Sequence, residues 1–317
     1  VTGAGGGLGR SHALELARRG AKVVVNDLGG AMDGTGGSSE AAEKVVSEIK
    51  ESGGEAISNG GSVSDRNGAK SMVDDAMEAW GRVDILINNA GILRDKSFSK
   101  IDLDDFQVVV DVHLMGAVYC THAVWPIMRE QNYGRILMTT SPTGLYGNFG
   151  QTNYGAAKLA QVGFMNSLKI EGAKNNIHTN TIAPIAATRM TESLIPEAVH
   201  SKLAPESVTP AALFLVSEEA PNGVTLDEGV HYNKFMYGNK IKMAAPLSDG
   251  IVEYGDGTVA SVEQMSKDVT SFLMWAAEPH LEARHQMGFK AIVYLIILTI
   301  LVYFSMKKIW SRVESEV

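Results

Sequence analysis

The chain has 317 residues, of which 45% are apolar, and it carries a net charge of −8 at pH 7. This length and composition suffice for a packed core, whereas the acidic charge and the lack of an Arg/Lys stripe argue against nucleic-acid binding. The single cysteine, Cys120, excludes an internal disulfide and any cysteine-based metal cluster, so no metal site is expected.

Up to about residue 220, short β-branched runs alternate with helical stretches. This alternation predicts an α/β fold, a doubly wound, Rossmann-like parallel sheet covered by helices. Val1 and Thr2 alone stand where the central first strand of such a sheet belongs, so we expect an N-terminally truncated fold with a weakened cofactor site. The later strands are expected at 23–26, 55–59, 83–88, 134–140 and 177–183, and the helices at 11–19, 39–52, 68–80, 103–130, 153–175 and 209–218.

The character of the sequence changes after Pro221. Turn-forming residues dominate 222–260, a helix is expected at 258–277, and residues 287–306 are almost entirely apolar. Twenty helical residues at about 1.5 Å each span the roughly 30 Å of a bilayer's hydrocarbon core. The pattern therefore predicts one transmembrane helix followed by a short basic tail.

A glycine-rich turn, TGAGGGLG, opens the chain directly before a helical run. Its glycines permit a tight turn, and the helix N-terminus then faces an anion such as a pyrophosphate. Asp27 closes the next strand, where a carboxylate can accept hydrogen bonds from a ribose 2′-hydroxyl. No Arg or Lys follows in LGGAMDGTGG, which favours NAD over NADP. The expected contacts in this turn are Gly3, Gly7, Leu8 and Gly9.

The run NNAG ends the strand at 83–88. Small residues and side-chain amides at this position can border the adenine ribose. Asn89, Ala90 and Gly91 are therefore expected to contact the cofactor. The same run is also compatible with an ordinary strand-end turn.

Tyr154 and Lys158 are four residues apart and share one face of a helix, and Ser141 follows the strand at 134–140. Oxidation of an alcohol needs a base, and a free tyrosine with a pKa of about 10 is a poor one at neutral pH. We expect the Lys158 ammonium, together with the positive nicotinamide, to favour the tyrosinate. Lys158 can also hold the nicotinamide ribose, and Ser141 can hydrogen-bond the substrate oxygen.

Taken together, TGxxxGxG, NNAG and the Ser…YxxxK set resemble the short-chain dehydrogenase/reductase family over residues 1–225. Longer runs, such as NNAGILRDKSF and YGNFGQTNYGAAK, look like the (3R)-hydroxyacyl-CoA dehydrogenase group of the peroxisomal multifunctional enzymes of type 2 and their bacterial relatives. The resemblance implies oxidation of a 3-hydroxyacyl thioester to a 3-ketoacyl thioester, and a homodimer or tetramer.

The same resemblance assigns three further residues. His113 in VHLMG stands where the family commonly has an asparagine, and it implies a proton relay, with a helix-packing histidine as the alternative. Pro184 and Thr188 fit the loop after the strand at 177–183, where Thr188 could reach the carboxamide of the cofactor.

Residues 224–315 resemble the C-terminal part and membrane anchor of cytochrome c1, the haem subunit of bc1-type complexes. In that family the methionine of the KMAAPLSDG-like segment, here Met243, is the axial haem ligand. Covalent haem needs CxxCH, and a chain with one cysteine cannot supply it, so haem is not expected.

The expected domains are a dehydrogenase domain at 1–225, a cytochrome c1-like segment at 226–286, a transmembrane helix at 287–306 and a tail at 307–317. We therefore expect a membrane protein with a single-pass C-terminal anchor and a cytoplasmic dehydrogenase domain. The orientation stays open. The basic residues after the span favour a cytoplasmic C-terminus, and a single span would then place the dehydrogenase domain on the other side of the membrane.

Three hypotheses follow. The chain is an NAD-dependent short-chain dehydrogenase carried on a membrane anchor. Alternatively, it is a membrane subunit that docks into a bc1-type complex through residues 230–317. In the third case, two coding sequences have been joined near residues 219–230 into a non-native chimera.

Overall fold

The structure is a computed structural model of the whole chain. It describes residues 1–186, 188, 203–223, 225–226, 231–232, 240–241, 254–277, 290, 294–296, 298–300, 302–304 and 306–307. The chain divides into two compact units, Val1–Lys242 and Met243–Val317. Each is described by itself.

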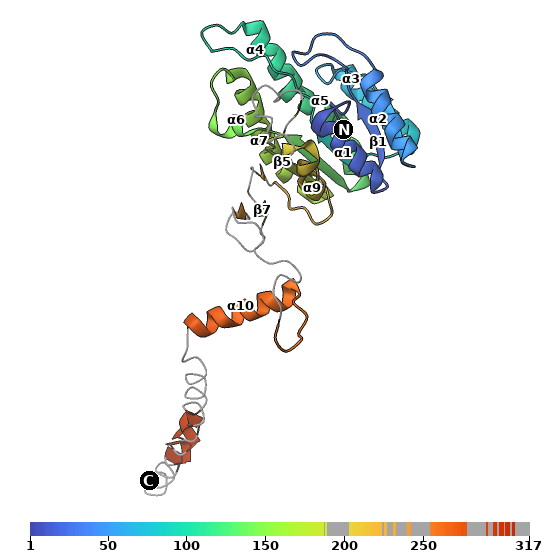
Figure 1. The fold of residues 1–317 in the computed structure, drawn as a ribbon. Helices are drawn as coiled ribbons and strands as arrows, with labels where there is room; N and C mark the ends of the chain where they lie inside the picture. Colours follow the sequence, from blue (N-terminus) through green and yellow to red (C-terminus); the bar gives the residue numbers. More distant parts are fainter. Residues whose placement is uncertain are drawn as a thin grey trace. The chain divides into compact units, whose positions relative to one another are not determined.

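The first unit is built on a parallel sheet, which confirms the predicted fold class (Figure 1). One part pairs β1 with β2, and the other has the order β3-β4-β5-β6. Two-residue β6 was missed by the sequence analysis, because a run so short leaves no periodic pattern. The strands are β1 (Lys22–Asn26), β2 (Glu55–Asn59), β3 (Ile85–Asn88), β4 (Gly134–Thr139), β5 (Ile177–Ile182) and β6 (Thr225–Leu226).

Val1 and Thr2 join the two parts of the sheet. Thr2 forms a parallel bridge with Asn26, and its N–H donates to the carbonyl of Ile87 at 3.0 Å. The backbone nitrogen of Val1 donates to the carbonyl of Val24 at 3.0 Å. A cavity of about 470 Å³ between β1 and β3 adjoins this joint.

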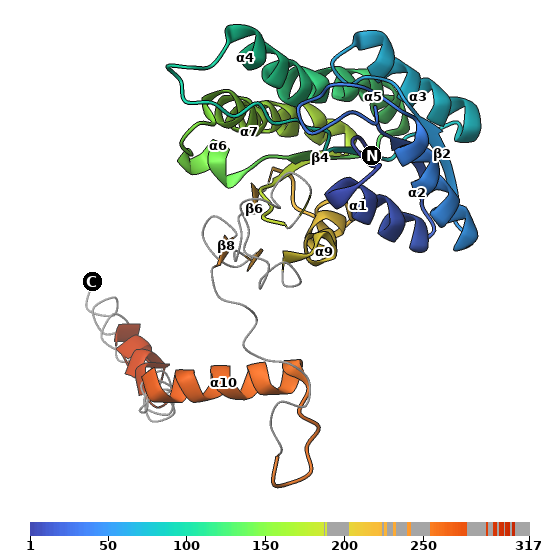
Figure 2. The ribbon, with the colours of Figure 1, turned by 45° about the horizontal axis from the view of Figure 1, so that its top comes forward.

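Helices cover both faces of the sheet (Figure 2). One apolar core packs α1, α2 and α9 on the sheet, and a second packs α3, α5 and α7. These helices, with the shorter ones between them, are α1 (Gly7–Arg18), α2 (Glu40–Glu51), α3 (Arg66–Trp80), α4 (Leu103–Val110), α5 (Gly116–Gln131), α6 (Pro142–Tyr146), α7 (Thr152–Gly172) and α9 (Pro205–Leu215), and a 3₁₀ turn, η2 (Ala173–Asn175), follows α7.

The helix predicted at 103–130 is interrupted. A five-residue π-helical turn, η1 (Asp111–Met115), separates α4 from α5 and carries His113. Hydrophobic periodicity gives no sign of such an insertion, although π-turns of this kind often occur at functional sites. The helix predicted at 209–218 begins earlier, because Pro205 occupies the first helical turn of α9, where proline is favoured.

The helix predicted at 258–277 is present as α10 (Val262–Ala277), shortened because residues 254–261 form a turn and an extended approach. The short strands β7 (His231–Tyr232) and β8 (Lys240–Ile241) form an antiparallel pair. Of the predicted span at 287–306, the described residues from 294 to 304 lie in the apolar helix Tyr294–Phe304, and the membrane anchor stays a prediction.

Within the part of the chain that the structure describes, one helical run, Leu103–Gln131, is long and apolar enough to cross a membrane. This run consists of α4, η1 and α5. Because α5 packs against α3 and contributes to the second apolar core, the run is explained as core helix of the sheet domain.

Candidate active site

The glycine-rich turn is packed too closely for side chains. A Cβ on Gly3, whose φ is +62°, would lie 2.8 Å from the Cα of Ala90, and one on Gly9 would lie 2.3 Å from the carbonyl oxygen of Gly3. Gly3 therefore lets the turn approach the NNAG segment, and Gly9 lets α1 pack against the turn.

The N-terminus of α1 opens onto free space beside the turn. A Cβ on Gly6 would meet nothing within 4 Å, and the first N–H groups of the helix, on Gly7, Leu8 and Gly9, have no partner inside it. On the far side, the side chain of Thr188 lies 3.4 Å from where a Gly7 Cβ would be. Free N–H groups at a helix N-terminus can bind an anion such as the pyrophosphate of a dinucleotide, and this role of the turn stays a prediction.

Asp27 lies directly after β1, and the backbone fixes its carboxylate. Its Oδ2 accepts from the N–H of Gly5 and its Oδ1 from the N–H of Gly29, each at 2.7 Å. An ionised carboxylate has about four acceptor positions, so two remain for ribose hydroxyls. Asp65, further along the chain, caps α3 by accepting from the N–H of Gly68.

The side chain of Asn89 faces the glycine turn rather than open space. Its Nδ2 donates to the carbonyls of Thr2 and Gly3, both at 3.0 Å, and the N–H of Ala90 donates to the Thr2 hydroxyl at 3.1 Å. The amide of Asn89 is thus engaged within the protein. The cofactor contacts expected of Asn89, Ala90 and Gly91 stay a prediction.

Gly91 also serves the catalytic side. A Cβ there would lie 2.4 Å from the Cε1 atom of His113, so the imidazole fills the place of a side chain. His113 Nε2 lies 2.8 Å from the carbonyl oxygen of Ile92, and the ring meets that of Tyr154 edge-on with centroids 5.1 Å apart. Its Nδ1 has no hydrogen-bond partner among the described residues, and burial lowers the pKa well below the usual value.

Ser141, Tyr154 and Lys158 meet at the carboxyl end of β4. Ser141 is the N-cap of α6, where its hydroxyl accepts from the N–H of Thr143, and Tyr154 lies in the first turn of α7. Lys158 is buried one turn further along α7, with its Nζ 2.5 Å from the carbonyl of Thr139 and 5.5 Å from the centroid of the Tyr154 ring. The structure thus brings together all four residues predicted to be catalytic.

The predicted tyrosinate is not what this geometry favours in the protein alone. Burial raises the pKa of Tyr154, the hydrogen bond with Ser141 opposes this rise, and the carboxylate of Asp95 adds to it. Burial also lowers the pKa of Lys158 to about 7, which weakens it as a source of positive charge. The expectation counted the charge of Lys158 but not the loss of its hydration.

Several site residues were missed by the sequence analysis. Asp95 is a partly buried carboxylate that accepts from Nε2 of Gln151 at 2.7 Å, and burial raises its pKa. Arg94 and Asn153 lie beside it and are joined by a hydrogen bond. The one available signal was the charged stretch RDK directly after NNAGIL.

Of the remaining predicted residues, two lie within the described part of the chain and one lies outside it. Pro184 follows β5 and is partly buried, as the loop assignment requires, and Thr188 faces the glycine turn. Met243, the haem-ligand position of the second resemblance, lies outside the described residues.

A parallel sheet, a glycine-rich turn before a helix, and a Ser, Tyr and Lys grouped at one strand end are typical of a nucleotide-dependent oxidoreductase. The chain belongs to the short chain dehydrogenase family, whose model matches residues 1–198. The model of the Cytochrome C1 family matches residues 210–313, which confirms the second resemblance at the level of sequence.

Individual relatives agree with the family. A short-chain type dehydrogenase/reductase of Mycobacterium tuberculosis is 52% identical over 71% of this chain and 79% of its own length. Mouse peroxisomal multifunctional enzyme type 2 is 53% identical over 72% of this chain, which spans 31% of that longer protein. The solved 7α-hydroxysteroid dehydrogenase complexed with NADH and 7-oxo glycochenodeoxycholic acid is 30% identical with a TM-score of 0.65, covering 72% of this chain and 90% of that one.

Proposed function

We propose that the chain interconverts a 3-hydroxyacyl-CoA and the corresponding 3-ketoacyl-CoA with NAD, and that Tyr154 is the acid/base. The observation that carries this proposal is the grouping of Tyr154 with buried Lys158, whose Nζ lies 5.5 Å from the centroid of the Tyr154 ring, and with Ser141 shortly after the end of β4. The thioester substrate is supported by the resemblance over residues 1–225 and by the similarity to the multifunctional enzyme.

The groups that would hold NAD are the N–H groups of Gly7, Leu8 and Gly9, the carboxylate of Asp27, and Thr188. When bound, NAD supplies a two-electron acceptor for hydride. The carboxylate of Asp27, which already accepts from two backbone N–H groups, favours a ribose hydroxyl over a 2′-phosphate, because two negative charges would repel each other.

In the oxidation, Ser141 donates a hydrogen bond to the substrate oxygen while the tyrosinate of Tyr154 takes the hydroxyl proton. As the O–H and C–H bonds at C3 break and a C=O bond forms, bound NAD would accept the hydride. In the reduction, the phenol of Tyr154 returns the proton to the oxygen. The raised pKa of Tyr154 keeps the phenol protonated, the form that reduction needs.

The test is NADH formation from a (3R)-3-hydroxyacyl-CoA by the full chain. Tyr154→Phe keeps the ring but removes the acid/base, and we expect kcat to fall by about 1,000-fold or more, within the range of acid/base loss in a buried site. Tyr119→Phe, on the distant face of α5, is the matched control and should retain the wild-type rate. An unchanged rate for Tyr154→Phe would exclude this residue as the acid/base.

A second candidate function rests on the Cytochrome C1 match over residues 210–313. We propose that residues 287–306 anchor the chain in a membrane and that residues 230–317 form the docking surface of a bc1-type complex. The residues present do not fit a covalent haem. Cys120 is the single cysteine, it is buried in α5, and burial raises the pKa of its thiol to about 12.

Membrane fractionation tests this second candidate. Co-purification of the chain with the bc1-type complex after detergent extraction would support it, and recovery of the chain from soluble fractions alone would exclude it. The intact mass of the purified protein decides between a single polypeptide and an artificial join near residues 219–230. A homodimer or tetramer, expected through the dehydrogenase domain, is tested by light scattering.

A further inference from the structure

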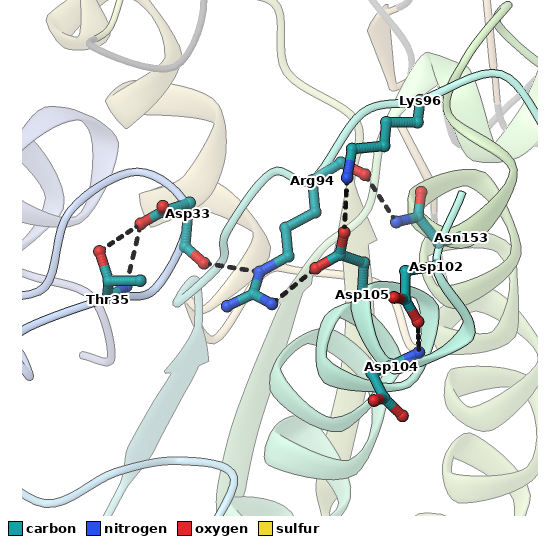
Figure 3. A network of polar contacts seen from close by, with 8 residues as sticks. All are labelled: Asp33, Thr35, Arg94, Lys96, Asp102, Asp104, Asp105 and Asn153. Atoms are coloured by element: carbon teal, nitrogen blue, oxygen red, sulfur yellow. Dashed lines mark hydrogen bonds and ion pairs between the residues drawn. The ribbon is translucent and has the colours of Figure 1, made fainter. Parts of the chain in front are cut away.

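The segment after NNAG, residues 92–96, lies between the cofactor side and the catalytic helix (Figure 3). On the cofactor side, the N–H of Leu93 donates to the carbonyl of Met32 at 3.0 Å. On the catalytic side, the N–H of Lys96 donates to the carbonyl of Gly150 at 2.9 Å, just before α7. One short segment therefore contacts two regions that are far apart in the sequence.

Arg94 makes side-chain contacts on one side of this segment and a main-chain contact on the other. Its Nε donates to the carbonyl of Asp33 at 2.9 Å, and its Nη1 donates to the carboxylate of Asp105 on α4 at 2.7 Å. Its own carbonyl accepts from Nδ2 of Asn153 at 3.1 Å. The Arg94 side chain is 24% exposed, so the ion pair with Asp105 is partly shielded from water.

Asn153 connects the segment at residues 92–96 to Tyr154, the proposed acid/base residue. It is fully buried in the first turn of α7, and its Oδ1 accepts from the N–H of Tyr154 at 2.8 Å. The two ends of one amide side chain thus connect the carbonyl of Arg94 with the backbone of Tyr154. A shift of the segment would move the start of α7 and the phenol with it.

The loop at residues 28–38 connects the same segment to Asp27, on the proposed cofactor side. The loop is closed at its base by a hydrogen bond from the N–H of Ser38 to the carbonyl of Leu28 at 2.9 Å. Gly29, beside this closure, donates its N–H to Asp27. At the tip, the carboxylate of Asp33 accepts from the N–H of Thr35, and the carbonyl of Asp33 receives Arg94. Arg94 therefore fixes the tip of the loop whose base orients Asp27.

We propose that Arg94 is a positioning residue that holds the loop at residues 28–38 and the start of α7 in one arrangement, so that Asp27 and Tyr154 are aligned. This inference rests on the proposed function, since it concerns the alignment of a cofactor and an acid/base residue. An arginine suits the task because its rigid fork donates in two directions at once, to a carbonyl and to a carboxylate, whereas a lysine is a single point charge.

The test compares Arg94→Ala, Arg94→Lys and the control Lys96→Met in the full chain. Lys96 also pairs with Asp105, but its side chain is 52% exposed and contacts Asp105 rather than the loop. For Arg94→Ala we expect NADH to bind about 10-fold more weakly and kcat to fall about 10-fold, with the hydroxyacyl KM within about 2-fold, since a misplacement of about 1 Å costs up to about 100-fold in rate. Arg94→Lys should recover part of each loss, and Lys96→Met should match the wild type.

Amide hydrogen exchange gives a readout that needs neither substrate nor cofactor. In Arg94→Ala, exchange should accelerate together at residues 31–35 and in the first turn of α7, and stay unchanged in α3. Unchanged NADH binding and kcat, or faster exchange spread over the whole domain, would overturn the proposal. If the wild type oxidises no hydroxyacyl-CoA, the proposed function fails, whereas the exchange pattern still decides the role of Arg94.

Discussion

The dehydrogenase unit and the segment around α10 differ in the range of their contacts. In the first, short motifs are held by residues far along the chain: Thr2 bonds Ile87 and Asn89, and Ser11 bonds Thr209. In the second, the described polar contacts are local, as where Tyr254 and Gln264 both bond Asp268. Contacts between residues that are far apart in the sequence hold a motif in place as a site. Sequence similarity to a family does not by itself provide such contacts.

The helix α9 lies near the boundary between the two family matches in the sequence. The Cytochrome C1 match begins at residue 210, inside α9 (Pro205–Leu215), yet Leu213 and Leu215 belong to the dehydrogenase core. Thr209 accepts or donates hydrogen bonds with Ser11 at 2.7 Å and His12 at 2.8 Å on α1. Packing therefore assigns α9 to the dehydrogenase, whatever its sequence likeness.

Among changes outside the acid/base residue itself, the largest effect is expected at Gly91, which packs against His113. In Gly91→Ala, the added methyl would lie 2.4 Å from His113, so the imidazole and the Tyr154 ring beside it must move. We expect kcat/KM to fall about 100-fold, as a displacement of about 1 Å can cause. Gly163→Ala, on an open face of α7, is the control and should keep wild-type activity in the same NADH assay. Full activity in Gly91→Ala would show that the close packing is unimportant.

The contact between α1 and α9 should make stability depend on pH. Burial lowers the pKa of His12 to about 4, below its usual 6.5, so the folded state favours the neutral imidazole. This contribution is complete above pH 6.5 and is lost as the pH falls toward 4, by up to about 3 kcal/mol at about 1.4 kcal/mol per pH unit. Urea unfolding between pH 4 and 7 measures it. His12→Gln should flatten the profile, and His122→Gln, on the exposed side of α5, should not.

A smaller effect is expected from removing the second region. Deletion of residues 243–317 takes away the second compact unit and leaves the residues of the proposed active site in place. We expect kcat within about 2-fold of the full chain, since activity depends on the groups that contact the reacting atoms. A loss beyond 10-fold would mean that the two regions form one functional unit.

The smallest effect is expected at Met243. Without a CxxCH pair a covalent haem has no attachment point, so Met243→Ala should change neither dehydrogenase activity nor the absorbance spectrum of the purified chain. A Soret band that shifts in Met243→Ala would show that this methionine ligates haem after all.

The sequence predicted the parts of the fold that depend on local pattern. The parallel strands, the glycine-rich turn at Gly3 to Gly9 and the shared face of Tyr154 and Lys158 follow from periodicity and spacing. Features that depend on long-range packing were missed or misjudged. The π-turn at His113 leaves the hydrophobic period unchanged, and the pKa of Tyr154 depends on a burial that no motif encodes.

The role of Arg94 could not be predicted for the same reason. Its partners Asp33 and Asn153 lie 61 and 59 residues away along the chain, so spacing gives no hint that they meet. An arginine directly after NNAGIL indicates only that a charge lies near the cofactor site.

In the proposed function, the site around Tyr154 transfers hydride from the substrate to NAD. The most direct measurement uses a 3-hydroxyacyl-CoA carrying deuterium at C3 and follows the label into the reduced nicotinamide by mass spectrometry. The full chain should place the deuterium on the nicotinamide, and Tyr154→Phe should place almost none there in the same time. Absence of label with the full chain, or equal labelling by Tyr154→Phe, would contradict the account.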